Sequence, residues 1–329
     1  MRRVSIIIPF FNPGPVLEES IRSAIAQTGV DCEIIAIDDG STDASLAIAR
    51  RYQSDIRVLT GPNRGVSAAR NRGIRETAGD WIVFLDADDL LTAGTLQKRF
   101  DALASVAADV VVCDWQEFVV REGTETDTKM RTADMDALAA DAEIACATSF
   151  WATTAALMYR RELVEKIGGL RSDLPVIQDA RFLFDAAHQG ARFVHSPHVG
   201  ARYRVMPESL SRRDPARFWR DSLLNGQQIE VLWRARAPLT SKQRMALCDI
   251  YNGVAHGLFR AGDPAFRRAL IALRAADLPI SRRNRILELM SAVAGQPKAV
   301  RLAELWTRQR RTLRRLDRSR LSLQERRTS

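Results

Sequence analysis

The sequence has few cysteines, few aromatic residues and no long apolar run. Its four cysteines, Cys32, Cys113, Cys146 and Cys248, lie far apart without metal-ligand spacing, which argues against a zinc module and favours reduced thiols. No apolar stretch approaches the ~20 residues that span a bilayer as a helix. With 46% apolar and 27% charged residues in a chain of 329, the composition is typical of a globular protein of about two domains.

The N-terminal segment MRRVSIIIPFFN begins with two arginines and an apolar run, as a secretory signal peptide does. Pro9 interrupts the run, the turn sequence NPGP follows, and no small-residue cleavage site is present. We therefore interpret residues 4–10 as a first buried strand and expect the protein to be cytoplasmic.

Charge is distributed unevenly along the chain. The net charge is +9, but residues 214–329 hold 24 Lys and Arg against 10 Asp and Glu, whereas residues 1–213 hold 25 against 30. The two parts therefore differ in kind. We expect one domain over 1–213 and a basic helical region over 214–329.

Residues 4–115 alternate between short β-branched runs, typical of strands buried on both faces, and segments with apolar residues at helical spacing. The expected strands are 4–10, 32–38, 56–60, 81–85 and 109–115, and the expected helices are 16–27, 41–53, 67–78 and 92–106. This alternation predicts an α/β fold with a Rossmann-like, mostly parallel sheet flanked by helices. In such sheets ligands bind beyond the carboxyl ends of the strands.

The following segments are less regular. Residues 116–147 are polar, acidic and weakly patterned, which predicts a long loop or lid. We expect a strand and a short helix within 155–169, a helix over 179–190, and two strands at 191–196 and 200–205. From residue 214 the pattern is helical, with breaks near Pro238, Asp263-Pro264, Pro279 and Pro297.

Two groups of aspartates directly follow expected strands. Asp38 and Asp39 end the second strand, and Asp86, Asp88 and Asp89 follow the run WIVFL. Because the carboxyl ends of parallel strands meet at one edge, this rim should be strongly acidic. Mg²⁺ or Mn²⁺ would offset the repulsion, and such ions are usually held by one or two carboxylates plus substrate phosphates.

The alternative is that the aspartates cap helices and turns. We favour that interpretation for Asp43 and Asp89. It does not explain Asp88, because capping does not require so dense a cluster.

The segments VSIIIPFFN, IDDGSTD, NRGVSAARN and FLDADD, in this order, resemble the family 2 glycosyltransferases over about residues 4–205. A lone Asp-x-Asp is a weak signal, whereas four ordered motifs at strand ends are specific. The resemblance implies a GT-A fold, to which the helical pattern from residue 214 adds a C-terminal helical region. It also implies inverting transfer of a sugar, usually from a UDP-sugar, to an acceptor hydroxyl, with Mn²⁺ or Mg²⁺ as cofactor.

The resemblance also assigns the nucleotide-sugar site. Phe11 falls where the family often has an aromatic residue that stacks on the base, and Asp39 matches the aspartate that accepts a hydrogen bond from it. Asp86 and Asp88 match the Asp-x-Asp carboxylates, both as metal ligands and Asp86 also near the ribose. The full nucleotide-sugar set is expected to be Pro9, Phe11, Asn12, Asp39, Asn63, Arg64, Arg70, Asp86 and Arg204.

From the residues alone, purely structural roles are also possible for several of these residues. Arg64 and Arg70 could lie on a solvated helix face, and Phe11 could be ordinary core packing. Arg204, in a segment that resembles a family motif with Met206 where His is common, could contact the diphosphate or equally form a structural salt bridge.

A sugar hydroxyl is a poor nucleophile until its proton is removed, so a carboxylate should face the anomeric carbon. In the family this base is the Asp of a Glu-Asp pair that opens a helix after a Gly-Gly turn. Here Gly168-Gly169-Leu170 precedes VIQDARFLF, which makes Asp179 the expected catalytic base. Gln178 replaces the usual Glu and puts rate or acceptor preference in question. From its position alone Asp179 could also be a helix N-cap.

Three further residues carry weaker signals. His195 and His198 lie two apart, but a zinc site needs more ligands nearby, so we expect ordinary histidines. Trp151 falls near the expected acceptor pocket, where flat aromatics stack on sugar rings, although a core role is the favoured prediction.

The C-terminal tail is basic and amphipathic. Leucines and Trp306 recur at helical spacing within 299–316, surrounded by arginines. Such a helix can bind an anionic membrane surface, which would suit a polysaccharide or lipid-linked acceptor at the inner face of the plasma membrane. It can equally pack on the catalytic domain. Nucleic acid is not an expected partner, because no recognised module accompanies the charge, and a homo-oligomer stays open.

Two other function classes stay open at this point. A nucleotidyltransferase also has an α/β nucleotide site, but no glycine- and lysine-rich phosphate loop follows the first strand. A non-catalytic, membrane-associated protein with a decayed transferase domain is the third possibility. The donor sugar, the acceptor and the linkage have no recognisable signature in the sequence.

Overall fold

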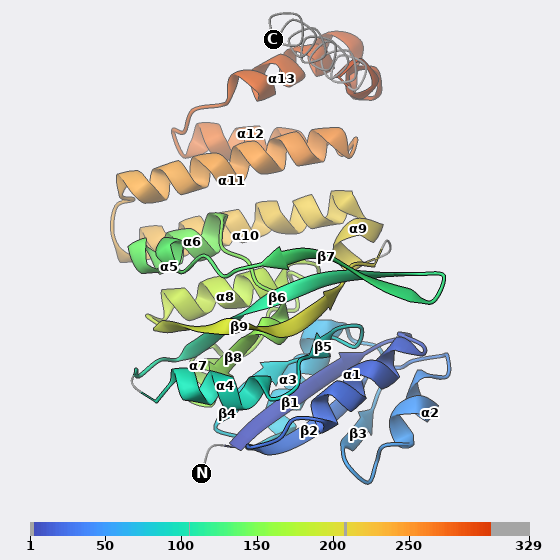
Figure 1. Ribbon diagram of the computed structural model, residues 1–329. Coiled ribbons are helices and arrows are strands. Elements are labelled where there is room, and N and C mark those ends of the chain that lie inside the picture. Colours follow the sequence, from blue (N-terminus) through green and yellow to red (C-terminus); the bar gives the residue numbers. More distant parts are fainter. Residues whose placement is uncertain (1–2, 105, 207–208, 304–329) are drawn as a thin grey trace, which may run out of the picture. The chain divides into compact units, whose positions relative to one another are not determined.

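The computed structural model describes residues 3–104, 106–206 and 209–303, and the chain divides into two compact units between Arg213 and Asp214. The first unit contains a nine-stranded sheet with helices packed against it (Figure 1). The second unit contains helices. Each unit is described by itself below.

The first half of the sheet is parallel. Its strands are β1 (Arg3–Phe10), β2 (Asp31–Asp38), β3 (Arg57–Thr60) and β4 (Trp81–Phe84), connected by α1 (Val16–Ile25), α2 (Ser45–Arg50) and α3 (Val66–Glu76). They lie in the order β3-β2-β1-β4. Every residue of β1 from Val4 to Phe10 is buried, as a central strand covered on both faces requires. The carboxyl ends of β1, β2 and β4 therefore meet at one edge.

The second half of the sheet is mixed. After β5 (Leu90–Leu91) and α4 (Thr95–Ala102) come β6 (Val110–Arg121), β8 (Leu157–Arg160) and β9 (Phe193–Arg204). β8 runs antiparallel to both β4 and β6, β9 is parallel to β6, and β5 is antiparallel to β9. The expected parallel arrangement thus holds for the first four strands, and the β4–β8 pair reverses it.

The prediction of a loop or lid over 116–147 is wrong. β6 continues to Arg121 and forms a hairpin with β7 (Thr124–Arg131), after which come α5 (Met135–Ala140) and α6 (Ala142–Thr148). The hairpin turn has positive φ at Glu122 and Gly123, 51° and 76°, as a type I′ turn does. Because β7 is exposed along nearly its whole length, its sequence lacks the apolar alternation that would have indicated a strand.

The two strands expected at 191–196 and 200–205 are one strand, β9. Pro197 lies inside it where its pairing with β6 shifts register, between Ser196 and Ala201, and bulges are where a strand tolerates proline. A short helix α7 (Arg161–Ile167), a 3-10 turn η1 (Thr154–Ala156), α8 (Gln178–His188) and α9 (Leu210–Arg213) complete the first unit.

The second unit confirms the expected C-terminal helices. They are α10 (Pro215–Arg236), α11 (Ser241–Arg260), α12 (Phe266–Ala275) and α13 (Arg282–Ala294), and residues 296–303 are helical as well. The last break lies at Gly295, with φ 72°. Pro297 instead falls in the first turn of the next helical segment, where the missing N–H breaks no helical hydrogen bond.

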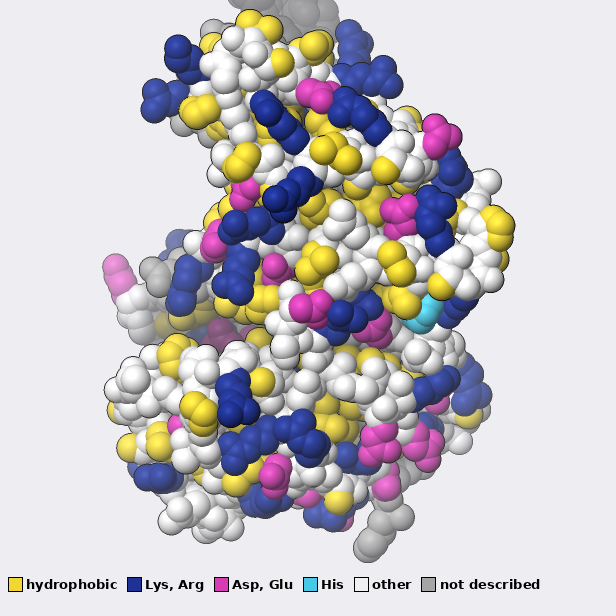
Figure 2. Space-filling view, turned by 180° about the vertical axis from the view of Figure 1, so that it is seen from behind, with side chains coloured by type: hydrophobic (Ala, Val, Ile, Leu, Met, Phe, Trp, Pro, Cys, Tyr) yellow, Lys and Arg dark blue, Asp and Glu magenta, His cyan; other side chains and the backbone are white. Residues whose placement is uncertain are grey.

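Basic and apolar side chains are interspersed on the helices of the second unit, on the face shown in Figure 2. No helix within the described residues is long and apolar enough to cross a membrane. Most of the predicted amphipathic helix over 299–316 lies outside the described residues, which end at 303.

Candidate active site

The turn after β1 carries Phe11 and Asn12. Phe11 is 50% exposed, which contradicts the core-packing alternative and leaves its ring accessible for the predicted stacking on a base. Asn12 has φ 52°, in the left-handed region that Asn tolerates, and its side-chain oxygen accepts the backbone N–H of Thr42 at 2.7 Å. Pro9 is buried in β1 beyond the last residue paired with β4, so its missing N–H interrupts no ladder there.

Asp39 fastens the loop after β3 to the end of β2. Its two carboxylate oxygens accept the backbone N–H groups of Arg64 and Gly65, each at 2.8 Å. Gly40 permits this approach, because its φ is 82° and a Cβ atom would lie 2.9 Å from the backbone nitrogen of Asn63. The side chains of Asn63 and Arg64 are exposed. Their contacts with ribose and phosphates, and that of Asp39 with the base, stay predictions.

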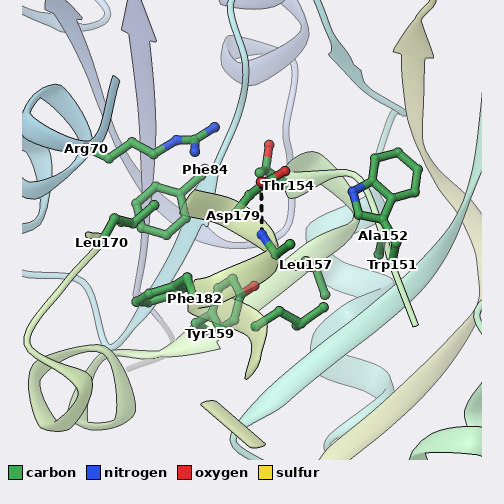
Figure 3. Close-up of a pocket in the computed structure, with 12 residues that line it drawn as sticks. Arg70, Phe84, Trp151, Ala152, Thr154, Leu157, Tyr159, Leu170, Asp179 and Phe182 are labelled. Atoms are coloured by element: carbon green, nitrogen blue, oxygen red, sulfur yellow. Dashed lines mark hydrogen bonds between the residues drawn. The ribbon is translucent and has the colours of Figure 1, made fainter. Parts of the chain in front are cut away.

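Arg70 lies buried at the centre of the site. α3 holds it at 2% exposure, which contradicts the solvated-face alternative for this residue. Its guanidinium donates to the Asp86 carboxylate and, at 2.6 Å, to the side-chain oxygen of Gln178, and it lies 5.6 Å from the ring centroid of Phe84. Arg70 thereby joins the Asp-x-Asp segment to the start of α8, which carries Asp179. Figure 3 shows Arg70 and Asp179 among the residues that line one pocket.

The three aspartates after β4 have different surroundings. Asp89 is 1% exposed, and its oxygens accept the backbone N–H of Arg204 and the hydroxyl of Thr153, each at 2.9 Å, so its role is structural. Asp86 and Asp88 are partly exposed. Burial and the neighbouring charge of Asp86 raise the pKa of Asp88 to about 6, because nearby carboxylates disfavour a second negative charge.

This carboxylate pair fits a divalent cation of the magnesium or manganese type. Asp86 and Asp88 offer hard oxygen donors. Burial first, and then the charge of Asp86, raise the pKa of Asp88, and a bound cation would offset both effects. Within the described residues no group of three His, Cys, Asp or Glu side chains could hold a metal alone. A site of this kind therefore needs further oxygen donors, and substrate phosphates usually supply them.

Arg204 forms the structural salt bridge that the sequence left open. It is 4% exposed, its guanidinium pairs with the Glu19 carboxylate, and it donates to the backbone carbonyl of Asp88 at 2.9 Å. Arg204 therefore helps to fix the backbone of the Asp-x-Asp segment at Asp88. A contact between Arg204 and the diphosphate stays a prediction.

Asp179 lies in the first turn of α8. The N-cap position is Ile177, so the N-cap alternative is wrong, and the Asp179 carboxylate accepts the backbone N–H of Ala180 at 2.9 Å. Burial raises the pKa of Asp179 above its ordinary value, while the charge of Arg70 and the Ala180 N–H oppose the rise. A carboxylate with a raised pKa is a stronger base, which suits the predicted role.

Sequence reasoning missed two polar residues of α3 that position the segment before α8. The Asn71 side chain exchanges two hydrogen bonds of 2.8 Å with the backbone of Leu170, and the Ser67 hydroxyl donates to the carbonyl of Arg171 at 2.9 Å. Ser67, Arg70 and Asn71 follow the i, i+3, i+4 spacing of one helix face. That polar stripe in NRGVSAARN was the available signal.

A pocket lies beside Asp179, lined mostly by apolar side chains (Figure 3). Trp151 and Thr154 are also among its lining residues. Trp151 is 40% exposed, and its ring centroid lies 5.5 Å from that of Trp115 and 5.8 Å from that of Tyr203. Trp151 is therefore an anchored wall of the pocket, and the favoured core prediction is wrong. Thr154 carried no sequence signal.

The two histidines of β9 have ordinary partners, as expected. His195 Nε2 lies 2.8 Å from a carboxylate oxygen of Asp114, and His198 lies within hydrogen-bonding distance of the hydroxyls of Thr95 and Ser196. The four cysteines are free thiols.

Comparison with known proteins supports the motif-based interpretation. The model of glycosyl transferase family 2 matches residues 5–168. The chain is 31% identical over 215 residues to the glycosyltransferase EpsJ of Bacillus subtilis, covering 63% of this chain and 62% of EpsJ. It is 38% identical over 112 residues to a cholesterol galactosyltransferase of Borreliella burgdorferi, covering 33% of this chain and 31% of that protein. The matched regions thus span less than two thirds of either relative.

Solved structures share the fold at low sequence identity. The S. aureus TarS fragment 1–349, crystallised with UDP-GlcNAc, has a TM-score of 0.57 at 18% identity, covering 89% of this chain and 92% of that chain. The mannosyltransferase PcManGT of Pyrobaculum calidifontis, in complex with GDP-Man and Mn²⁺, has a TM-score of 0.55 at 21% identity, covering 93% and 87%. Residues 5–168 therefore belong to glycosyltransferase family 2, and the chain has the GT-A fold that the sequence predicted.

Proposed function

We propose that the protein is an inverting glycosyltransferase that moves a sugar from a nucleoside-diphosphate sugar, most simply a UDP-sugar, to a hydroxyl group. The observation that carries the proposal is the Asp86–Arg70–Gln178 connection. It links the Asp-x-Asp carboxylates to the first turn of α8, where Asp179 lines a pocket. The buried Arg70 guanidinium thus lies between two functional groups. On one side are the carboxylates that would bind a metal and its diphosphate, and on the other is Asp179, the proposed general base.

The chemistry follows from these positions. The acceptor oxygen attacks the anomeric carbon, the bond from that carbon to the diphosphate oxygen breaks, and the bonding electrons leave with the diphosphate. Asp179 takes the proton of the attacking hydroxyl, and its raised pKa makes it a better acceptor. Because a single displacement occurs, the configuration at the anomeric carbon inverts.

Asp86 and Asp88 would hold a Mn²⁺ or Mg²⁺ ion, which when bound neutralises charge that develops on the leaving diphosphate. Arg70 keeps Asp86 oriented through their ion pair. Phe11, with half of its surface exposed, offers a face for the base, and the backbone around Asp39 shapes the adjacent loop.

Relatives support the choice of substrates. Structures of similar fold were solved with UDP-GlcNAc and with GDP-Man and Mn²⁺, and one matching relative is a cholesterol galactosyltransferase. We propose a saccharide or lipid-linked acceptor, taken up at the inner face of the plasma membrane. Residues 214–329 carry a balance of +14, which would suit an anionic lipid surface.

A screen with defined nucleotide-sugars tests the proposal. UDP-glucose, UDP-galactose, UDP-GlcNAc and GDP-mannose are added to the protein with and without Mn²⁺. One of them should raise the melting temperature in the presence of the metal, because a ligand that binds only the native state stabilises it. That donor should also release nucleoside diphosphate faster with Mn²⁺.

Stereochemistry tests the mechanism separately. With methanol as acceptor the product is a methyl glycoside, which does not mutarotate, and NMR gives its anomeric configuration. Retention would contradict direct displacement. Absence of any melting shift and of any diphosphate release, over all four donors, would contradict the proposed function itself.

A further inference from the structure

Helix α13 of the second unit has a fixed inner face. Asn284, Leu287 and Ser291 on this face are 3%, 7% and 3% exposed. The Asn284 side chain donates to the backbone carbonyl of Asn252 in α11 at 2.9 Å, and the backbone N–H of Ser281 donates to the Asn252 side-chain oxygen at 2.8 Å. These contacts hold α13 in one orientation on α11 and determine which of its side chains point away from the helix pair.

Three aliphatic side chains lie on the outer face of α13. Ile286, Leu289 and Val293 are 41%, 66% and 88% exposed, at the i, i+3, i+7 spacing that places residues on one side of a helix. Single exposed aliphatic residues are common on protein surfaces. Three of them in a row form an apolar strip instead, and contiguous exposed apolar surface indicates a binding partner.

The charged residues of α13 are almost all basic. Arg282, Arg283 and Arg285 are exposed, in the same first turns of the helix as Ile286. The one acidic residue of α13, Glu288, forms an ion pair with Arg274 of α12 at 2.8 Å. The helix therefore has no further carboxylate to offset its arginines, and its outer face combines aliphatic side chains with positive charge.

The sign of the charge argues against two possible partners of this face. Residues 304–329, which lie outside the described residues, hold nine Lys and Arg against three acidic residues, so their net charge has the same sign as that of α13. A second copy of the face would repel the first for the same reason. The charge favours an anionic partner, and the apolar strip requires that this partner also accept aliphatic side chains.

An anionic lipid surface has both properties. Anionic headgroups attract Lys and Arg side chains near the surface, and the apolar side chains of a surface-bound helix enter the boundary between headgroups and acyl chains. Nucleic acid would supply negative charge, but its phosphate backbone has no apolar layer for a strip of aliphatic side chains. Lipid is therefore the partner that matches both features of α13.

We propose that the outer face of α13, formed by Ile286, Leu289 and Val293 with the neighbouring arginines, binds the surface of an anionic membrane. This inference goes beyond the proposed function, because it assigns a lipid-binding surface to a unit that contains none of the candidate catalytic residues. The surface also precedes residues 299–316, the segment in which the sequence indicated an amphipathic helix.

Co-sedimentation of the full chain with vesicles tests the proposal. The wild-type protein should bind vesicles of phosphatidylcholine with about one third phosphatidylglycerol at least about tenfold more tightly than vesicles of phosphatidylcholine alone. The double variant Leu289→Ser, Val293→Ser should lose about tenfold in affinity for the anionic vesicles, because two aliphatic side chains no longer enter the bilayer.

A second double variant, Val231→Ser with Met245→Ser, is the matched control. Each of these side chains is 67% exposed, on α10 and α11 respectively, so the control removes exposed apolar surface from other helices of the same unit. It should bind the anionic vesicles as wild type does. Without vesicles, the two double variants should have similar melting temperatures, because neither loses a buried side chain.

Each alternative partner gives a different result. If residues 304–329 covered the face, Leu289→Ser, Val293→Ser would melt below the control variant without vesicles. If a second copy covered it, light scattering would show a wild-type dimer and a monomeric variant. Either result overturns the proposal.

The proposal is also overturned if the wild type does not bind the anionic vesicles, if the α13 variant binds them as wild type does, or if variant and control lose affinity equally. The vesicle experiment contains no nucleotide-sugar and no metal. Its result is therefore independent of the transferase assay, and either proposal can fail while the other stands.

Discussion

The two aspartate groups at the carboxyl edge of the sheet look alike in sequence but differ in what surrounds them. At the end of β2, Asp38 accepts the backbone N–H of Ser41 at 2.9 Å and the hydroxyl of Thr60 at 2.7 Å, and Asp39 accepts two backbone N–H groups. At the end of β4, Asp88 has a pKa raised to about 6 by burial and by its neighbour Asp86. The first group is satisfied by hydrogen bonds from the protein. In the second group Asp86 pairs with Arg70 and Asp89 accepts two hydrogen bonds, but the pKa of Asp88 stays raised.

This difference indicates two roles for the aspartates: those after β2 shape the site, and Asp88 after β4 is available to hold a ligand. Carboxylates that accept hydrogen bonds from nearby N–H and O–H groups fix loops, as Asp39 fixes residues 64 and 65. Carboxylates crowded together without enough donors store electrostatic repulsion, which a cation can remove. Substitutions at Asp88 and Asp38 test this difference, and substitutions at Asp179 and Gln178 test the role of Arg70 beside the β4 group.

The largest effect is expected at Asp179, which shares the buried cation Arg70 with the β4 group. Asp179→Asn keeps the shape but cannot take a proton, so transfer should fall by about 10²–10⁴-fold, the usual contribution of a general base. Nucleotide affinity, measured by calorimetry with UDP and Mn²⁺, should change little. Transfer at the wild-type rate would refute the assignment of the base.

Asp88→Asn should abolish the effect of Mn²⁺. The wild-type melting temperature with UDP should rise on addition of Mn²⁺, and the variant should lose that rise, because a ligand-linked stabilisation disappears with the ligand site. Asp136→Asn is the matched control, since Asp136 is exposed on α5, away from the sheet edge. An undiminished Mn²⁺ response in Asp88→Asn would place the metal elsewhere.

Metal-free protein gives a second test at Asp88. Its pKa of about 6 lies above the ordinary 3.8, so ionisation disfavours the folded state above pH 6, and stability should rise as pH falls from 6 toward 4. Asp88→Asn should therefore raise the metal-free melting temperature at pH 8. It should reduce the rise on acidification without abolishing it, because the pKa of buried Asp89 is also raised.

The opposite result is expected at Asp38. Asp38→Asn replaces a carboxylate that accepts two hydrogen bonds with a weaker acceptor, in a position that is 2% exposed. The free energy of unfolding should fall by about 1–3 kcal/mol, as measured by urea denaturation. The Mn²⁺ response should be that of the wild type. If Asp38→Asn instead stabilised the metal-free protein, the distinction between the two groups would be lost.

Much of this arrangement could be predicted from the sequence. The β-branched runs at 4–10 and 81–85 are buried strands, and the ordered motifs brought Asp39, Asp86 and Asp88 to one edge. Parallel strands and helical crossovers leave little choice about which end of a strand faces a ligand. The family resemblance likewise placed Asp179 at the start of a helix, after the Gly168-Gly169 turn.

Other features were not predictable, because they depend on tertiary contacts. The hairpin of β6 and β7 lies with one strand almost wholly exposed, so no apolar pattern marks it. The burial of Arg70 follows from partners 16 and 108 residues away in the chain. Thr154 lies in a short 3-10 turn without a motif, and its unpaired hydroxyl becomes visible only when its surroundings are known.

Substitution of Gln178 should have the smallest effect on the transfer rate. It tests how the positive charge of Arg70 acts on both Asp86 and Asp179. In the family a glutamate usually stands at this position, whereas here a neutral amide oxygen accepts from Arg70 at 2.6 Å. The charge of Arg70 is thus shared between Asp86 and Asp179, and it lowers the pKa of Asp179 against the effect of burial. A new carboxylate at position 178 would compete for that charge.

Gln178→Glu should therefore raise the pKa of Asp179, and the sign of the effect is fixed. Transfer requires ionised Asp179 and is lost as pH falls through its pKa, so the acid limb of the pH–rate profile should move to higher pH in the variant. The rate at pH 8 should stay within about tenfold of wild type. Gln178→Leu should show no such displacement but a lower rate throughout, because it leaves a buried donor of Arg70 without its acceptor. Identical pH profiles for wild type and Gln178→Glu would mean that Arg70 does not couple Asp86 to Asp179, and that burial alone raises the pKa of Asp179.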